Sequence, residues 1–306
     1  MRLQYVMRRL RSRIKARLLA FTAAVVPAAG VARAQSGEVH QHVTFTSKVL
    51  GADVRYSVYL PTDYGVSTRR YPVLYLLHGR GDDDTAWLQN GEANRTADDM
   101  IASGELAPMI IVMPNAQLSW YVNDFTGKVP WEDMFVKEFM PEIERQYRTQ
   151  TGKGSRAVAG LSMGGFGALL FAMHHPDLFG SAAALSAAIF TDDEVIAAPQ
   201  RKYDGLFGDT FGDGRVGQAR LTDHWRNNSV MDLARTLPLD TLRSFRWYID
   251  CGDDDDLSTG NAALHILLAQ RKIPHQYRVR DGGHNWNYWR AALPDVLRFV
   301  AQGFGG

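Results

Sequence analysis

The stretch Gly160-Leu161-Ser162-Met163-Gly164-Gly165 decides the fold class of this chain of 306 residues. It matches the pattern G-x-S-x-G, in which a serine projects from a tight turn between a strand and a helix. The backbone of such a serine is strained, so the residues two positions away on each side must lack bulk, and Gly160 and Gly164 satisfy this. A small apolar strand, Ala157–Ala159, is predicted before the turn and an apolar helix after it. This context favours an elbow that carries a reactive serine over the glycine-rich helix start of an ordinary α/β protein.

Strands and helices are predicted to alternate on both sides of this turn. The continuous apolar runs Tyr71–Leu77 and Met109–Met113 are typical of strands that are buried on both faces. Val43–Val49 and Val54–Leu60 are predicted to pair as an antiparallel hairpin. Further strands are expected at Arg156–Ala159, Ser181–Ala187, Phe245–Ile249 and His275–Val279, and helices at Glu132–Tyr147, Gly164–His174, Ala262–Gln270 and Trp289–Ala301. The alternation predicts an α/β fold with a mostly parallel central sheet, helices on both faces and an antiparallel N-terminal hairpin.

The chain is expected to consist of a sorting signal followed by one domain. Residues 1–34 hold eight basic residues, no acid, the apolar run Leu18–Val26 and the small-x-small sequence Ala32-Arg33-Ala34. This combination is typical of a secretory signal peptide, so we expect a secreted or periplasmic protein; an arginine-rich presequence or surface helix is the alternative. Residues 35–306 are predicted to form a single domain, because the alternating pattern never restarts. Within it, residues 191–240 are rich in Gly and Asp and are expected to form an irregular insertion or lid over one edge of the site.

Composition and charge exclude several classes of protein. With 45% hydrophobic and 22% charged residues, the chain can build a globular core, unlike a disordered chain or a fibrous rod. The net charge is +1, and without the eight basic residues of the first segment it is −7, so no nucleic-acid partner is expected. No run after the signal is apolar enough for stable membrane insertion. Cys251 is the only cysteine, which excludes an internal disulfide and a cysteine-based zinc site, and a buried inert thiol is expected there.

A serine hydroxyl needs a base, usually a histidine held by an acid, and in hydrolases of this fold the chain order is serine, acid, histidine. His284 is the predicted base, because it lies in a flexible loop after the last predicted strand, where such sheets place their chemistry. The acid should follow the strand Phe245–Ile249, and five carboxylates are available there, Asp250 and the run Asp253–Asp256. Position alone does not choose among them. A calcium-binding loop is the rival interpretation of this run, but the spaced D-x-D-x-D-G arrangement is missing.

Backbone amides and aromatic side chains complete the expected site. The N–H groups of Met163 and Arg80 are the predicted oxyanion-hole donors, with Gly81 as the alternative to Arg80. Trp120, Tyr121 and Trp286 are candidates for stacking on a sugar or cinnamoyl ring, and packing is the alternative for each. The motifs of zinc proteases, nucleotide-phosphate loops and dinucleotide-binding turns are missing, so no metal or organic cofactor is expected.

The combined motifs resemble one branch of the α/β-hydrolases over roughly residues 40–303. The motifs are Tyr75-Leu76-Leu77-His78-Gly79, Trp131-Glu132-Asp133, Gly160–Gly165, Cys251–Asp255, and Gly282-Gly283-His284 with Tyr288-Trp289. This esterase branch includes feruloyl and acetylxylan esterases, S-formylglutathione hydrolases and mycolyltransferases. The resemblance implies that Asp255 is the acid, with Asp254 and Asp256 as alternatives. Arg80 departs from the Gly or Leu that is usual in the family at that position, so the rim of the oxyanion hole is expected to differ.

The expected activity is hydrolysis of a carboxylic ester through an acyl-enzyme on Ser162. Export and the resemblance favour a small-molecule or polysaccharide-linked ester, with an acyl, acetyl or feruloyl group on a carbohydrate. His284 must be neutral to act as base, so turnover is expected to rise through about pH 6–7. Two other functions remain: acyl transfer to a sugar alcohol, as in the mycolyltransferases, and a non-catalytic secreted binding module.

Overall fold

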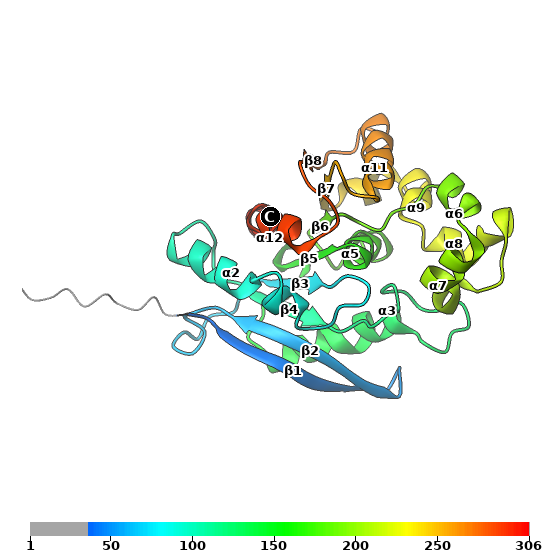
Figure 1. The fold of residues 1–306 in the computed structure, drawn as a ribbon. Helices are drawn as coiled ribbons and strands as arrows, with labels where there is room; N and C mark the ends of the chain where they lie inside the picture. The colour runs from blue at the N-terminus through cyan, green and yellow to red at the C-terminus, as the bar shows by residue number, and fades with distance from the viewer. Residues whose placement is uncertain (1–35, 306) are drawn as a thin grey trace, which may run out of the picture. The chain divides into compact units, whose positions relative to one another are not determined.

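A single mixed sheet organises the computed structural model, which describes residues 36–305 (Figure 1). The predicted signal segment 1–34 lies outside the described residues. The strand order is β1-β2-β4-β3-β5-β6-β7-β8. The strands are β1 Glu38–Ser47, β2 Ala52–Leu60, β3 Val73–Leu77, β4 Ile110–Pro114, β5 Arg156–Leu161, β6 Ser181–Leu185, β7 Arg246–Gly252 and β8 Gln276–Arg280. Strands β3 to β8 run parallel, whereas β1 pairs antiparallel with β2, and β2 with β4. The predicted α/β fold, with its parallel sheet and N-terminal hairpin, is confirmed.

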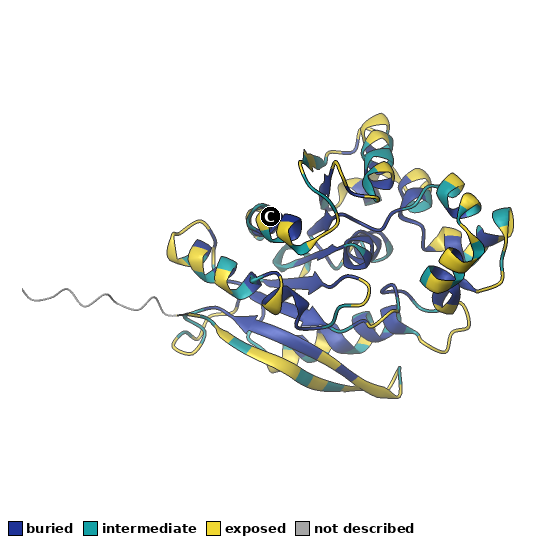
Figure 2. Ribbon diagram, viewed as in Figure 1, coloured by how far each residue is buried: buried dark blue, intermediate teal, exposed yellow. Residues whose placement is uncertain are grey.

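Helices cover both faces of the sheet. α1 Ala86–Gln89, α2 Ala93–Ala102 and α12 Trp286–Ala301 pack on one face. α3 Trp131–Met134, α4 Met140–Gln146, α5 Met163–His174 and α11 Ser258–Gln270 pack on the other. The central strands are continuous apolar runs because alternate residues enter opposite cores: Val73 and Tyr75 join one, Leu74 and Leu76 the other. Figure 2 shows these central strands buried, while β1 at the sheet edge carries many exposed residues.

The segment 191–240 is mostly helical, so the prediction of an irregular insertion is wrong. It contains α6 Asp192–Ala197, α7 Gln200–Phe211, a 3-10 turn at Gly217–Arg220, α8 Asp223–Asn227, α9 Val230–Thr236 and α10 Leu239–Arg243. Local side-chain bonds start several of these helices: Thr191 and Glu194 form a reciprocal capping box, and Ser229 caps α9. Arg220 is buried and donates to the carbonyls of Val195, Ile196 and Ala198 at the end of α6. Contacts of this kind hold short helices that have little stability of their own.

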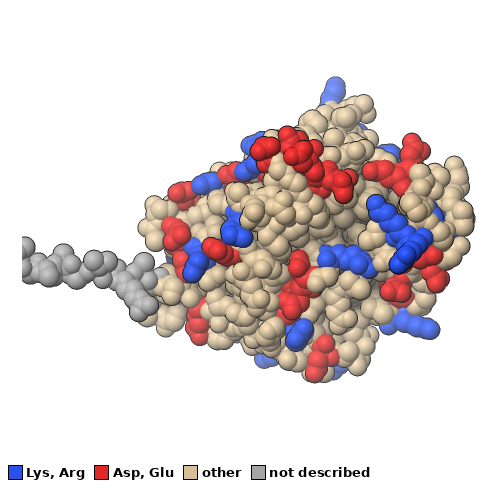
Figure 3. All heavy atoms as spheres, viewed as in Figure 1, with Lys and Arg blue, Asp and Glu red and all other residues tan. Residues whose placement is uncertain are grey.

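The other predicted elements are present with boundaries shifted by up to five residues, as at β1, and α1 and α2 were not predicted. The predicted helix Glu132–Tyr147 is α3 and α4 joined by a π-helical turn at Phe135–Phe139. β7 continues through Asp250 and Cys251, past the predicted end at Ile249. Within the described part of the chain, every helix is too short or too polar to span a membrane. Basic and acidic side chains are interspersed on the face shown in Figure 3.

Candidate active site

Ser162 occupies a strained turn between β5 and α5. Its backbone has φ 54° and ψ −117°, outside the regions that a non-glycine residue normally adopts. The turn is held by two backbone bonds, from Ser162 N–H to the Leu185 carbonyl (2.9 Å) and from Ala188 N–H to the Ser162 carbonyl (2.9 Å). A Cβ atom on Gly164 would collide with the carbonyls of Leu77 and His78 at the end of β3. Glycine is required there because the strand end and the helix start approach so closely.

His284 lies between Ser162 and Asp255 and is within hydrogen-bonding distance of both. Its Nε2 is 2.9 Å from Ser162 Oγ, and its Nδ1 is 2.9 Å from Asp255 Oδ2. The imidazole is 35% exposed, whereas the carboxylate of Asp255 is fully buried. In the neutral form, Nδ1–H donates to the carboxylate and Nε2 accepts from the serine hydroxyl. This geometry allows the serine proton to pass to His284 while Asp255 holds the ring.

Asp255 is the one acid of the five candidates that contacts His284. Burial alone would raise the pKa of Asp255, but hydrogen bonds from His284, Leu257 N–H and the Ser186 hydroxyl bring that pKa below its ordinary value. The carboxyl group is therefore ionised at neutral pH. Asp250 is buried in β7 and accepts hydrogen bonds from Tyr248 and Tyr288 instead. Asp253, Asp254 and Asp256 are exposed.

Two residues support Asp255 and His284, and the sequence analysis missed one of them, Ser186. Ser186, just after β6, has φ 45° and accepts a hydrogen bond from Trp289 Nε1 (3.0 Å). The Trp289 ring also packs edge-on against His284, with ring centroids 4.8 Å apart. No sequence pattern indicates a serine with positive φ, so the role of Ser186 can be recognised only in the structure. The nearby thiol of Cys251 is buried, and burial raises its pKa to about 12, in keeping with an inert thiol.

The loop after β3 passes directly beside the serine. A Cβ atom on Gly79 would lie 3.5 Å from Ser162 Cβ. His78 is buried, and its Nε2 accepts from Ala116 N–H (2.9 Å), so its Nδ1–H donates to the Gly79 carbonyl (2.7 Å). Arg80 follows in this loop, while Met163 is the first residue of α5, where N–H groups have no partner within the helix. The two predicted oxyanion donors therefore belong to the two segments that flank the hydroxyl.

The segment after β4 is strained and clamped to this loop. Gln117, Trp120 and Tyr121 all have positive φ, which is unusual for side chains of this bulk. Trp120 Nε1 donates to the Leu206 carbonyl of α7 (2.8 Å), and Tyr121 Oη donates to the His78 carbonyl (2.8 Å). Tyr121 is completely buried, so its ring has no free face. The expectation that Tyr121 stacks on a substrate is therefore wrong; its hydroxyl holds the loop after β3.

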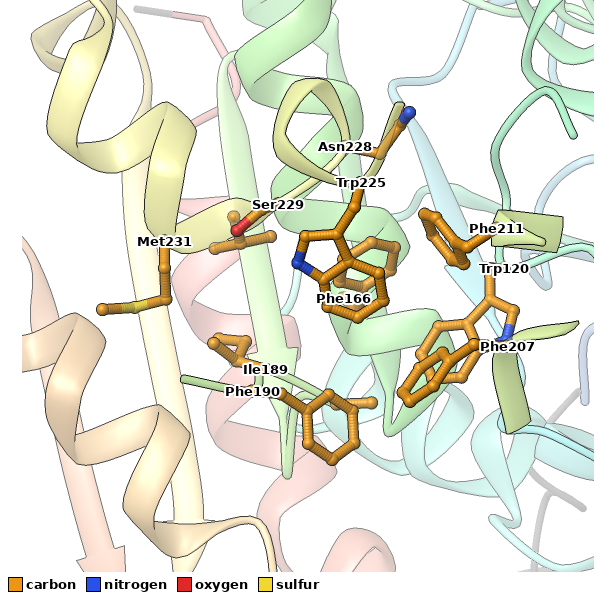
Figure 4. A pocket seen from close by; sticks show the side chains of 12 residues that line it. Trp120, Phe166, Ile189, Phe190, Phe207, Phe211, Trp225, Asn228, Ser229 and Met231 are labelled. Atoms are coloured by element: carbon orange, nitrogen blue, oxygen red, sulfur yellow. The ribbon is translucent and has the colours of Figure 1, made fainter. Parts of the chain in front are cut away.

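A narrow aromatic cavity of about 20 Å³ is lined in part by Phe166, which lies one helical turn after Ser162 in the sequence (Figure 4). Its aromatic lining residues are Trp120, Phe166, Phe190, Phe207, Phe211 and Trp225. Of the three aromatic candidates from the sequence, Trp120 lines this cavity. Trp286 is half-buried and packs edge-on against Trp87 and Trp289. Phe207 and Phe211 were missed, although their spacing of four residues on one helix face was a usable signal.

Three exposed carboxylates near the site approach one another. Single ligand oxygens of Asp253, Asp254 and Asp281 lie within 4.8 Å of each other. Asp253 also accepts a hydrogen bond from Gly282 N–H. Exposed acidic groups of this kind are common on protein surfaces, and these lie outside the row formed by Ser162, His284 and Asp255.

Comparisons with known proteins agree with this architecture. A family model described as "Putative esterase" matches residues 47–300. An "Endo-1,4-beta-xylanase/feruloyl esterase" of Xylanibacter ruminicola is 35% identical over 53% of this chain and 23% of the relative. An esterase of Mycobacterium tuberculosis is 31% identical over 85% of this chain and 57% of the relative. The chain thus spans less than two thirds of the length of these curated relatives.

A solved structure titled "ferulic acid esterase" is similar over nearly its whole length. It is 34% identical, has a TM-score of 0.75, and the match covers 88% of this chain and 99% of that one. A fluorophosphonate-binding serine hydrolase of Staphylococcus aureus, at 20% identity and a TM-score of 0.73, shares the fold. From the extent of the family match, the chain belongs to the esterase family of the α/β-hydrolases.

Proposed function

We propose that this chain is an exported serine esterase that hydrolyses acyl esters of carbohydrates. The observation that carries the proposal is the hydrogen-bonded row of Ser162, His284 and Asp255. Residues 1–34 act as the signal peptide, and residues 35–306 form the catalytic domain. The segment 191–240 covers one side of the site. No cofactor takes part in the proposed reaction.

The proposed reaction proceeds in two steps. Ser162 Oγ attacks the ester carbonyl carbon while its proton moves to His284 Nε2, and Asp255 stabilises the imidazolium that forms. The N–H groups of Met163 and Arg80 bind the oxyanion of the tetrahedral intermediate. His284 then gives its proton to the leaving alcohol, and an acyl-enzyme remains. A water molecule, deprotonated by His284, attacks this acyl-enzyme and releases the acid and the free serine.

The aromatic cavity supports an aromatic acyl group as the preferred substrate. A planar ring such as that of ferulate would enter this cavity once its lining side chains move apart, and it would then pack edge to face or offset against Trp120, Phe166 and Phe207. The similar proteins named as feruloyl or ferulic acid esterases point to the same acyl group. The alcohol part of the ester is then a carbohydrate.

Hydrolysis of methyl ferulate, p-nitrophenyl acetate and acetylated xylan by purified protein tests the proposal. Ser162→Ala should lose at least about a thousandfold in kcat and still fold, because it removes only a partly exposed hydroxyl. Ser244→Ala is the matched control, since Ser244 is an exposed serine just before β7. Turnover that survives Ser162→Ala would refute the proposed nucleophile. If the wild-type protein cleaves none of the three esters and is not labelled by a fluorophosphonate, the proposed esterase activity is refuted. If it transfers the acyl group to an added sugar and does not hydrolyse the ester, the proposed attack of water on the acyl-enzyme is refuted.

A further inference from the structure

A second, larger concavity opens at the same edge of the sheet as Ser162. Its volume is about 660 Å³, against about 20 Å³ for the aromatic cavity. Its walls come from the start of β2, the segment after β4, and α7. We call it the polar groove and define it by Asp53, Arg55, Asn115, Lys128, Asp209 and Thr210.

Along the strand order, Ser162 follows a strand that lies between the strands whose ends contribute to the two cavities. The polar groove lies at the end of β4 and the start of β2, which is antiparallel to β4 and so begins at the same edge. Gly79 and Ser162 follow β3 and β5, the next two strands in the sheet. The aromatic cavity is lined by Ala188–Phe190, which follow β6, the strand after these. Two strand spacings, roughly 10 Å, separate β4 from β5, so a substrate that reaches the groove from Ser162 must be an extended one.

The lining of the polar groove suits a neutral, hydroxyl-rich ligand. Three carboxylates, Asp53, Asp124 and Asp209, face two cations, Arg55 and Lys128, so a polyanion would meet as much repulsion as attraction. Among the described residues, the side chains of Asp209 and Lys128 make no hydrogen bond or ion pair and are exposed. They are therefore free to accept from and donate to the hydroxyls of a ligand.

Apolar surface is interleaved with these polar groups. Leu118 and Val129 line the groove and are 42% and 46% exposed. Carbohydrates present C–H faces as well as hydroxyls, and a groove that mixes aliphatic and polar side chains matches both.

One helix contributes to both cavities. Phe207 and Phe211 of α7 line the aromatic cavity, whereas Asp209 and Thr210 line the polar groove. The strained segment that carries Gln117 and Trp120 likewise contributes residues to both. Non-glycine residues with positive φ persist where the surrounding structure holds them, and they cluster at binding sites.

We propose that the polar groove binds the neutral oligosaccharide chain of the ester substrate while its acyl group occupies the aromatic cavity. This inference rests on the proposed function and adds the site for the alcohol side of the substrate. In this proposal the oligosaccharide chain leaves the ester oxygen at Ser162, runs toward the polar groove and ends between Lys128 and Asp209. No bond other than the ester changes in this step.

Kinetics on matched esters test the proposal. The double variant Lys128→Ala/Asp209→Ala should raise KM for a feruloylated arabinoxylan oligosaccharide by about tenfold, because two hydrogen-bonding side chains are removed. KM and kcat for methyl ferulate should stay within about twofold of the wild type, since that substrate does not reach the groove. Lys202→Ala/Asp213→Ala is the control. Lys202 and Asp213 are exposed, lie in the segment 191–240 that also carries Asp209, and do not line the polar groove.

Binding without catalysis separates this proposal from the proposed function. Ser162→Ala should bind unesterified xylotetraose or cellotetraose in calorimetric titration, and the groove double variant in the same background should lose that binding. Two outcomes would overturn the groove proposal and leave the proposed esterase activity intact. One is a wild-type kcat/KM that is equal for methyl ferulate and the oligosaccharide ester, and the other is a Ser162→Ala protein that binds neither tetraose. If no ester is cleaved, the proposed function fails, and the titration still decides the groove.

Discussion

Replacing Glu132 by Gln should produce a loss of stability that is greatest in mildly acidic solution. Glu132 is buried, and its Oε1 accepts from His174 Nδ1 (2.8 Å) and His175 Nε2 (2.9 Å). His174 Nε2 faces the Asn227 carbonyl at 2.9 Å, so both ring nitrogens of His174 meet acceptors, which favours the imidazolium form. The cluster joins α3 to the end of α5, the helix that starts beside Ser162.

The pKa shifts of this cluster set the size and the pH window of the effect. Burial would raise the pKa of Glu132, but the hydrogen bonds from the two histidines lower it from 4.5 to about 2. This difference corresponds to about 3 kcal/mol of unfolding free energy, which is present above the unfolded pKa and is lost as the pH falls from about 4.5 to about 2. Burial would lower the pKa of His174, but Glu132 raises it above 6.5. The contribution of His174 is therefore present below about pH 6.5 and is lost as the pH rises through its folded pKa.

Urea unfolding from about pH 3 to 9, followed by tryptophan fluorescence, measures this profile. The difference in unfolding free energy between wild type and Glu132→Gln should be largest between about pH 5 and 6.5 and should shrink on both sides. Glu138→Gln is the control. Glu138 lies in the next helical turn, and its carboxylate accepts hydrogen bonds from the Ser47 hydroxyl and from Val49 N–H instead of from imidazoles. A difference that does not vary with pH, or one that is largest near pH 3, would show that the charged pair does not form.

Two further perturbations test the packing of the elbow and the support of Asp255. Gly164→Ala should destabilise the protein by about 1–3 kcal/mol in urea unfolding, because the new methyl group meets backbone atoms that cannot move away. Gly205→Ala is the control: its Cβ would have no neighbouring atom within 4 Å, so it should stabilise α7 by about 0.5–1 kcal/mol. Equal changes in the two variants would contradict the close approach at Gly164. Ser186→Gly keeps the positive φ, which glycine adopts readily, but removes a hydroxyl that donates to Asp255. The pKa of Asp255 should therefore rise, and kcat should fall by about three- to tenfold with KM unchanged. A pH–rate profile identical to that of the wild type would show that Ser186 does not support Asp255.

The central sheet was predictable because its strands are buried on both faces. A run such as Val73–Leu77 must be apolar at every position, and this signal survives without knowledge of its neighbours. The tight turn at Ser162 could be predicted from the sequence for a similar reason, because it requires glycine two residues before and two residues after the serine. The structure brings Ser162 and His284 together because both follow parallel strands, whose carboxyl ends share one edge.

The choice among the five acids was not available from the residues alone. It depends on where β7 ends: the strand runs to Gly252, which buries Asp250 inside the sheet and leaves Asp255 on the turn that faces His284. A Cβ atom on Gly252 would collide with the Gly282 carbonyl, so the turns after β7 and β8 pack directly on each other. That packing is a tertiary contact, and no local pattern encodes it.

The helices of the insertion were missed for a different reason, and that reason bears on how the site works. α7 carries glycines, and it is held by side chains from distant loops: Arg80 Nη2 donates to the Gly205 carbonyl (2.7 Å) and Trp120 Nε1 donates to the Leu206 carbonyl (2.8 Å). Arg80 and Trp120 belong to the two loops that follow β3 and β4 beside Ser162. The wall of the aromatic cavity is thus tied to the loop that carries the proposed oxyanion donor. We therefore expect a movement of α7 that admits an acyl group to shift the Arg80 backbone, which would couple filling of the cavity to the position of the proposed oxyanion donor.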